Sequence, residues 1–123
     1  YEFGLKWRFP VDPNGNSGIL LHTEDDRIWP KSIHVQLHRP KAGSVFPSGE
    51  AKSDNQLAVK DLSKPLNQWN ECVIRCIDNK ISLEINKKKV GEVTGCKPSK
   101  GKIALQSEGS EVHFQQIWVR KLS

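Results

Sequence analysis

The sequence lacks any apolar run close to the about 18 residues that a membrane-spanning helix requires, so we expect no membrane span. It contains no methionine, and no basic and apolar signal region precedes the alternating pattern that begins at Tyr1. Its 123 residues are enough to bury one core without added crosslinks. We therefore expect one domain over residues 1–123, as a fragment or processed product, and the sequence leaves its compartment open.

Cysteine is scarce, and its spacing argues against a crosslinked framework. Cys72 and Cys76 lie four residues apart on one expected strand, which separates them by roughly 13 Å and prevents a bond between them. Either could pair with Cys96 in an exported protein, and this alternative remains open. The spacings match no zinc motif. We therefore expect all three side chains to pack as small apolar groups.

Histidine also forms no set of metal ligands. His34 and His38 lie too far apart along one expected strand to share an ion. His22 could meet His34 only across neighbouring strands, and no third ligand at a suitable spacing completes the set. We therefore expect no metal site and no cofactor.

The net charge of +5 would permit an anionic partner, and the tract Lys87–Lys89 is its densest part. That tract lies between two apolar alternations, where an exposed hairpin turn must be polar. No aromatic RNA-binding motif, zinc-finger spacing or recognition helix accompanies the charge. Nucleic acid is therefore not an expected partner.

Alternation with a period of two is the main structural signal, and it is found in residues 3–9, 16–22 and 32–38. Successive side chains of a strand point to opposite faces of a sheet, so each segment has an apolar and a polar face. The expected core positions are Leu5, Trp7, Ile19, Leu21, Ile33, Val35 and Leu37. On the opposite, polar side the pattern places Arg8, His22, His34 and Gln36 on one shared surface.

Further strands follow along the chain, which predicts an antiparallel β-sandwich. Residues 69–93 are expected to form a meander with turns at Asp78–Asn79 and Lys87–Lys88, and strands at 102–106 and 112–122 complete the fold. The prolines and glycines of residues 40–55 indicate a long loop, and only residues 57–62 could form a helical turn. Trp69, Val73 and Ile77 are expected on one side of their strand, and Trp69 and Trp118 are also expected core positions.

Six short segments occur in the order found in the 3-keto-disaccharide hydrolase family, and the chain resembles that family over nearly its whole length. They are Tyr1–Arg8, Asn16–Ile19, Ile33–Gln36, Gln68–Asn70, Gly101–Gln106 and Val112–Ile117. The resemblance implies an all-β, concanavalin A-like jelly roll of two antiparallel sheets with a concave, sugar-sized groove. It also implies that the full domain has strands upstream of Tyr1, and it favours an exported protein.

The same resemblance assigns candidate site residues. Gln36 and Arg8 match the family pattern, and His22 stands where members often have arginine. Lys6 and His34 stand where members have glutamate, so His34 is the candidate catalytic acid or base. Trp29 is a candidate for stacking on a sugar ring, although it could equally cover the edge of the core.

Three hypotheses about function follow. The first is an enzyme that acts on glycosides or 3-keto-disaccharides by proton transfer, and the second is a carbohydrate-binding module that has lost the family carboxylates. The third is a scaffold domain of a larger protein. The expected partner is a carbohydrate, while the sugar, the linkage and the oligomeric state stay open.

Overall fold

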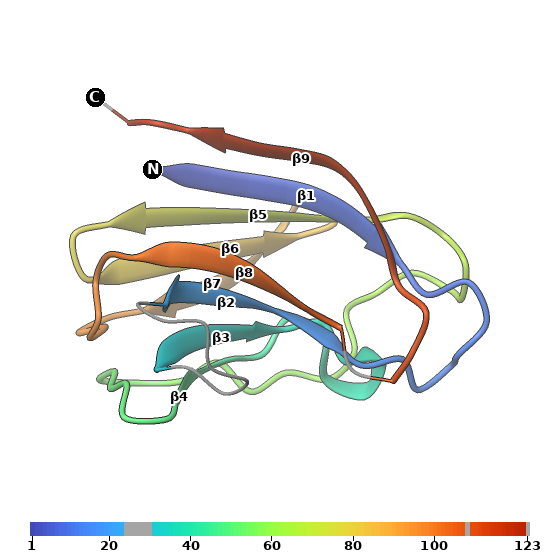
Figure 1. The fold of residues 1–123 in the computed structure, drawn as a ribbon, viewed down its shortest axis with the longest axis horizontal. Helices are drawn as coiled ribbons and strands as arrows, with labels where there is room; N and C mark the ends of the chain where they lie inside the picture. Colours follow the sequence, from blue (N-terminus) through green and yellow to red (C-terminus); the bar gives the residue numbers. More distant parts are fainter. Residues whose placement is uncertain (24–30, 108, 123) are drawn as a thin grey trace.

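The computed structural model describes residues 1–23, 31–107 and 109–122, which form two antiparallel sheets packed face to face. Figure 1 shows the two layers, with the N- and C-termini side by side at one end of the upper layer. This arrangement confirms the prediction of an all-β sandwich. No helix among the described residues is long and apolar enough to cross a membrane.

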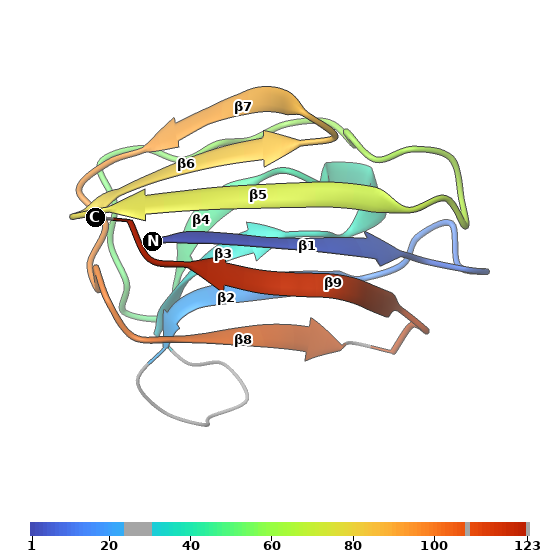
Figure 2. The same cartoon turned by 90° about the horizontal axis from the view of Figure 1, so that it is seen from above.

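The larger sheet has five strands in the order β7-β6-β5-β1-β9, as Figure 2 shows from above. Its strands, in chain order, are β1 (Glu2–Arg8), β5 (Asn70–Ile77), β6 (Lys80–Ile85), β7 (Lys88–Val93) and β9 (His113–Arg120). β5, β6 and β7 form the predicted meander, with the first turn at residues 78–79 as expected and the second at residues 86–87, one residue before the expected Lys87–Lys88. Asp78, Asn86 and Lys87 have positive φ, as tight hairpin turns require.

The smaller sheet has four strands in the order β4-β3-β2-β8. They are β2 (Ser17–Thr23), β3 (Ser32–Gln36), β4 (Val45–Ser48) and β8 (Lys102–Ser107). β2 and β3 pair directly, as the two alternating segments predicted. A short 3-10 helix, η1 (Arg39–Lys41), joins β3 to β4.

The core lies between the two sheets and contains every residue predicted from the alternation of the first three strands. Leu5, Trp7, Ile19, Leu21, Ile33, Val35 and Leu37 are each at most 1% exposed. Burial of an aliphatic or aromatic side chain of this size stabilises the folded state by roughly 1.5–3 kcal/mol. The three cysteines are also buried and free, in agreement with their predicted packing role.

The prediction for β5 was wrong about which face is buried. Cys72, Ile74 and Cys76 point into the core, whereas Ile77 is 47% exposed and Trp69 and Val73 are only partly buried. The segment carries apolar side chains on both faces, so periodicity alone gives no preference between them. The core prediction was also wrong for Trp118, which is 40% exposed and lies against Gly4 on the outer face.

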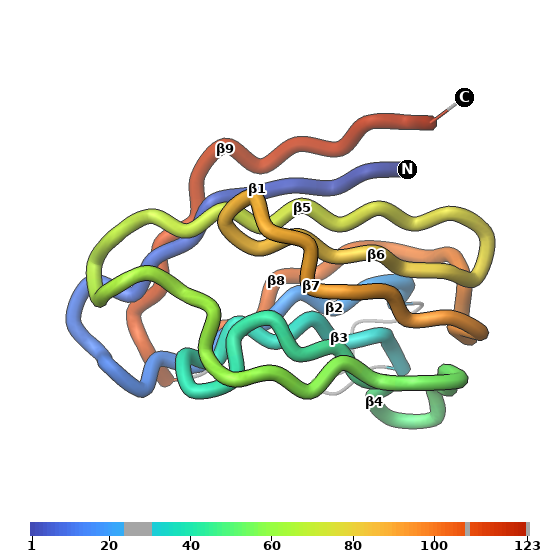
Figure 3. Tube along the Cα trace, turned by 180° about the vertical axis from the view of Figure 1, so that it is seen from behind, coloured from blue at the N-terminus to red at the C-terminus, as the bar shows by residue number. Residues whose placement is uncertain are grey.

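Residues 40–62, which follow β3, also differ from their prediction. Residues 40–55 contain the last two residues of η1 and strand β4, and residues 57–62 form no helix. β4 includes Pro47, which lacks the N–H of a regular strand residue and is tolerated because β4 is an edge strand. Residues 49–69 then cross from the smaller to the larger sheet, as Figure 3 shows from behind.

This crossing segment covers one side of the sandwich. Leu57 exchanges two backbone hydrogen bonds with Val45 of β4, and the Asp54 N–H donates to the carbonyl of Thr94, which follows β7. The side formed by β8 and β9 is less covered: Leu105, Ile117 and Val119 are 38%, 53% and 66% exposed.

Candidate functional site

The outer face of the smaller sheet carries the residues that the sequence placed on one polar surface of β2 and β3. The pairing register aligns Gln36, Gly18 and Gln106 in one row across β3, β2 and β8. The next row aligns Phe46, His34, Leu20 and Ala104 across all four strands. These side chains point away from the core because their neighbours Ile33, Val35 and Ile19 point into it.

His34 is the centre of this surface. Its ring stacks on Phe46, with ring centroids 4.8 Å apart and an interplanar angle of 24°. Its Nε2 atom leans over Gly18, where a Cβ atom would lie only 2.3 Å away. The ring is therefore covered by Phe46 on one side and by the backbone of β2 at Gly18 beneath it. His34 is buried on the outer face, not between the sheets.

Burial also determines the charge of the imidazole. Removal from water disfavours the protonated form and lowers the pKa of His34 to about 4. Its Nε2 atom has no hydrogen-bond partner among the described residues. His34 is therefore a neutral imidazole near pH 7, and one ring nitrogen is left without a polar contact.

Amide side chains stand on both sides of this imidazole. A Cβ at residue 18 would also lie 2.9 Å from Gln106 Oε1, so the amide of Gln106 and the ring of His34 approach the same point above Gly18. Gln36 lies opposite Gly18 on the other neighbouring strand and is half-buried. An amide offers both a donor and an acceptor, which suits the hydroxyl groups of a sugar.

No carboxylate projects from the outer face of the four strands β2, β3, β4 and β8. Their outward positions hold glycine, leucine, histidine, glutamine, phenylalanine, serine, alanine and lysine. The usual machinery of glycoside hydrolysis, two carboxyl groups flanking the scissile bond, is therefore absent from these strands. Among the described residues, no three histidine, cysteine, aspartate or glutamate side chains are grouped so that they could hold a metal ion.

His22 does not share this surface, and here the prediction was wrong. The pairing of β2 with β8 shifts between Leu20 and Thr23, and His22 has a φ of 64°. This bulge turns the ring, so that Nε2 shares a 2.7 Å hydrogen bond with the Tyr1 hydroxyl and Nδ1 lies 3.2 Å from the Pro98 carbonyl. Burial is the main reason that its pKa is lowered. His22 ties the end of β2 to the neighbouring segments.

Arg8 lies on the opposite side of the molecule, which also contradicts the predicted shared surface. β1 belongs to the larger sheet, so Arg8 projects from that sheet's outer face. Its guanidinium lies 4.5 Å from the ring centroid of Trp69, and its Nε donates to His113 Nδ1 at 3.0 Å. Lys6 projects from the same face. Lys6 and His34, the two positions at which the resemblance implied glutamate, therefore lie on opposite surfaces.

Trp29 lies outside the described residues. Two residues of the surface were missed by sequence reasoning, Phe46 and Gln106. Phe46 was hidden in a segment interpreted as a loop because Pro47 follows it. Gln106 alternates with apolar residues along β8, and this period would have placed it on the polar face once β8 was paired with β2.

Comparisons with known proteins agree with this architecture. Two candidate glycosyl hydrolases from Parabacteroides distasonis ATCC 8503 are 22% and 18% identical, with TM-scores of 0.72 and 0.68. The first match covers 98% of this chain and 77% of the other, and the second covers 94% and 69%. The carbohydrate-binding module CBM66 from Bacillus subtilis is 10% identical with a TM-score of 0.69, covering 94% of this chain and 71% of the module.

The Caenorhabditis elegans galectin LEC-6 is 14% identical with a TM-score of 0.63, over 96% of this chain and 81% of the galectin. These similarities in fold confirm the predicted concanavalin A-like jelly roll. No curated protein matches the chain. The model of the 3-keto-alpha-glucoside-1,2-lyase-like domain matches residues 1–120. The chain therefore belongs to the 3-keto-alpha-glucoside-1,2-lyase-like family, as its resemblance to the 3-keto-disaccharide hydrolases predicted.

Proposed function

We propose that this domain binds a disaccharide or a 3-keto-disaccharide on the outer face of the smaller sheet, without cleaving it. Phe46 stacks on the sugar ring, and the amides of Gln36 and Gln106 hydrogen-bond to its hydroxyl groups. The ring of His34 packs against the ring of Phe46 and fixes its orientation. The observation that carries the proposal is the outer face itself, with amides and an aromatic ring around a neutral imidazole and no carboxylate on its four strands.

The exposure of each residue supports this division of roles. Phe46 and Gln36 are half-buried, so each keeps surface that a ligand can contact, whereas His34 is only 5% exposed. One face of the Phe46 ring is covered by His34, and the exposed part of this half-buried ring is the part that would contact a sugar. Family membership supports a carbohydrate as the ligand. The binding module and the galectin among the proteins of similar fold support a binding role without chemistry.

A second candidate function is catalysis by His34 on a keto-sugar. The observation that favours it is the Nε2 atom, which has no hydrogen-bond partner among the described residues. A base of this kind would have to take a proton from the substrate, and a pKa of about 4 makes the imidazole a weak one. The same atom is buried, so substrate would reach it only after a neighbouring side chain moved.

Calorimetric titration with a 3-keto-disaccharide and with its parent disaccharide tests the binding proposal. We expect saturable binding of at least one of the two sugars, with no product formed after prolonged incubation. Gln36→Ala and Phe46→Ala should each weaken binding by roughly tenfold, the loss expected for one hydrogen bond or one aromatic contact. Gln56→Ala, which changes an exposed glutamine outside the strands, is the matched control and should bind as the unmodified protein does.

Two results would overturn the proposal. One is that neither sugar binds, and the other is that Gln36→Ala and Phe46→Ala bind as tightly as the control. Measurable turnover would favour the second candidate. In that case His34→Gln should lower the rate about a hundredfold while leaving the affinity nearly unchanged.

A further inference from the structure

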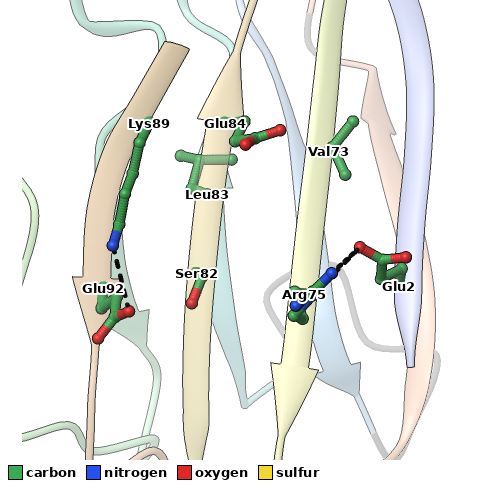
Figure 4. Close-up of a pocket in the computed structure, with 8 residues that line it drawn as sticks. All are labelled: Glu2, Val73, Arg75, Ser82, Leu83, Glu84, Lys89 and Glu92. Carbon is green, nitrogen blue, oxygen red and sulfur yellow. Dashed lines mark hydrogen bonds and ion pairs between the residues drawn. The ribbon is translucent and has the colours of Figure 1, made fainter. Parts of the chain in front are cut away.

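Two depressions on the outer face of the larger sheet differ in how their charges are arranged. The first, of about 310 Å³, is shown in Figure 4. Its charges are largely neutralised within it, because Glu2 accepts hydrogen bonds from Arg75 and Arg120, and Glu92 pairs with Lys89 at 3.5 Å. Such a surface offers little net attraction to a charged ligand.

The second depression, of about 350 Å³, lies where the end of β1, the start of β5 and the β6–β7 turn meet. It is lined by Lys6, Lys64, Trp69, Glu71, Asn86 and Lys87. None of the three lysines forms an ion pair with the described residues, although Lys6 lies directly opposite Glu71 in the strand register. The lining thus carries three ammonium groups and one carboxylate, and it attracts an anion.

The indole of Trp69 is fixed in place beside these lysines. The Arg8 guanidinium lies 4.5 Å from its ring centroid. Arg8 is held in turn by His113, whose Nδ1 must accept from the Arg8 Nε–H, so the imidazole proton is on Nε2 and is donated to Glu111 at 2.6 Å. This chain across β9 and β1 orients Arg8, and Arg8 covers one face of the indole. Trp69 also lines the depression.

The floor of the depression is also rigid. Asn86 accepts a hydrogen bond from the Glu71 N–H at 2.9 Å and donates to Asn70 Oδ1 at 3.1 Å. Asn70 Oδ1 accepts a further bond from the Lys64 N–H at 2.6 Å. These bonds fix the backbone that carries Lys64 and Lys87 relative to β5. The backbone positions from which Lys64 and Lys87 project into the depression are therefore fixed.

We propose that this depression is a second binding site, for an acidic saccharide that bears a carboxylate or a sulfate group. The sugar ring stacks on Trp69, Glu71 accepts hydrogen bonds from its hydroxyls, and Lys6, Lys64 and Lys87 neutralise its anionic group. The volume is at the lower end of the roughly 300–1,000 Å³ typical of small-molecule sites, which suits one or two sugar units. The site is on the opposite surface from Phe46 and Gln36, and it is independent of the function proposed for them.

The test is calorimetric titration of the whole chain with three trisaccharides of equal length: galacturonic acid trimer, a sulfated trisaccharide and neutral cellotriose. We expect one or both acidic sugars to bind more tightly than cellotriose by at least about tenfold, and the comparison of the two identifies the anionic group. Binding should weaken as salt is raised, because exposed charges are screened. Lys64→Glu and Trp69→Ala should each weaken it by roughly tenfold.

Lys100→Glu is the matched control for charge reversal. Lys100 is exposed and precedes β8, whose first residue pairs with the last residue of β2, at the other end of the sandwich from the depression. Lys64 and Lys87 are also exposed, so the test does not depend on the folding of the tryptophan variant. Equal binding of cellotriose, or equal loss in Lys64→Glu and Lys100→Glu, would overturn the proposal. Gln36→Ala should leave this binding unchanged, which separates the two sites.

Discussion

The ring of His34 stacks on that of Phe46 at 4.8 Å, so an aromatic residue of an edge strand excludes water from a histidine of the neighbouring strand. This contact, together with the absence of a side chain at Gly18, explains why a histidine on an outer face is only 5% exposed. The chemistry of the surface follows from that burial, because it keeps the imidazole neutral.

Removal of the Phe46 ring should return the imidazole to water. In Phe46→Ala we expect the pKa of His34 to rise from about 4 toward the ordinary value of 6.5, because desolvation is the cause of the shift. Phe46→Leu keeps most of the cover and should raise it less. Titration of the imidazole C–H signals by NMR measures both values. An unchanged pKa in Phe46→Ala would show that other groups bury the ring.

The lowered pKa of His34 predicts a loss of stability in mild acid. Between pH 6.5 and pH 4 the unfolded chain takes up a proton at His34 that the folded chain does not, so protonation favours unfolding. The stability contributed by this group is complete above about pH 6.5 and decreases as the pH falls toward 4, by at most about 3 kcal/mol.

His34→Gln removes this component of the pH dependence. The pKa values of Glu2, Asp12 and His22 are also lowered in the folded chain, but their contributions remain in the variant. The difference between the two proteins in urea unfolding, measured from pH 7 to pH 4, therefore isolates His34. Parallel curves for the two proteins would contradict the prediction.

Gly18 should tolerate no side chain while His34 is present. A Cβ there would lie 2.3 Å from Nε2, and the imidazole is held between Phe46 and the sheet, so we expect Gly18→Ala to cost about 1–3 kcal/mol. In a double-mutant cycle with His34→Ala, most of this cost should disappear. Additive effects in urea denaturation would place the strain elsewhere.

Gly4 offers a contrasting case on the other sheet. A Cβ there would lie 2.4 Å from the indole of Trp118, but that side chain is 40% exposed and belongs to an edge strand. The indole can move outward, so Gly4→Ala should cost less than Gly18→Ala, by about 1 kcal/mol or more. The same denaturation measurement compares the two, and an equal or larger cost for Gly4→Ala would contradict the argument.

The three thiols should be unreactive in the folded chain. Burial raises the pKa of Cys96 to about 11 and also raises the pKa of Cys72 and Cys76, so little thiolate forms at pH 8. We expect negligible labelling by a disulfide reagent in the native state and three labelled cysteines per chain in denaturant. One labelled cysteine in denaturant would instead reveal a disulfide, the alternative that sequence spacing left open.

Periodicity predicted the faces of individual strands well but not the sheet to which each strand belongs. The alternation around Ile19 and Ile33 correctly gave the core and the pairing of β2 with β3. It could not show that β1 lies in the other sheet, because that depends on long-range pairing with β5 and β9. Arg8 was therefore predicted beside His34 and is found on the opposite surface.

Two further errors came from local backbone geometry and from composition. The bulge after Leu20 turns the His22 side chain away from the predicted face of the sheet. Residues 19–23 contain no glycine or proline that would have predicted the bulge. In β5, valine and isoleucine occupy both faces, so the sequence pattern alone did not identify the side that holds Cys72 and Ile74. The prediction of a family succeeded because it used the order of segments and did not depend on either detail.

The exposed side chains of β9 have a consequence for the behaviour of the chain at high concentration. Residues 49–69 cover the side of the sandwich that holds β4 and β7, and β4 also has Pro47, which blocks further strand addition. β9 is an edge strand that shows Ile117 and Val119 to solvent, and only the bulge near Gln116 interrupts it. An unpaired edge with apolar side chains is a template for another strand, so β9, like the other uncovered edge strand β8, is a site at which intermolecular β-pairing would occur.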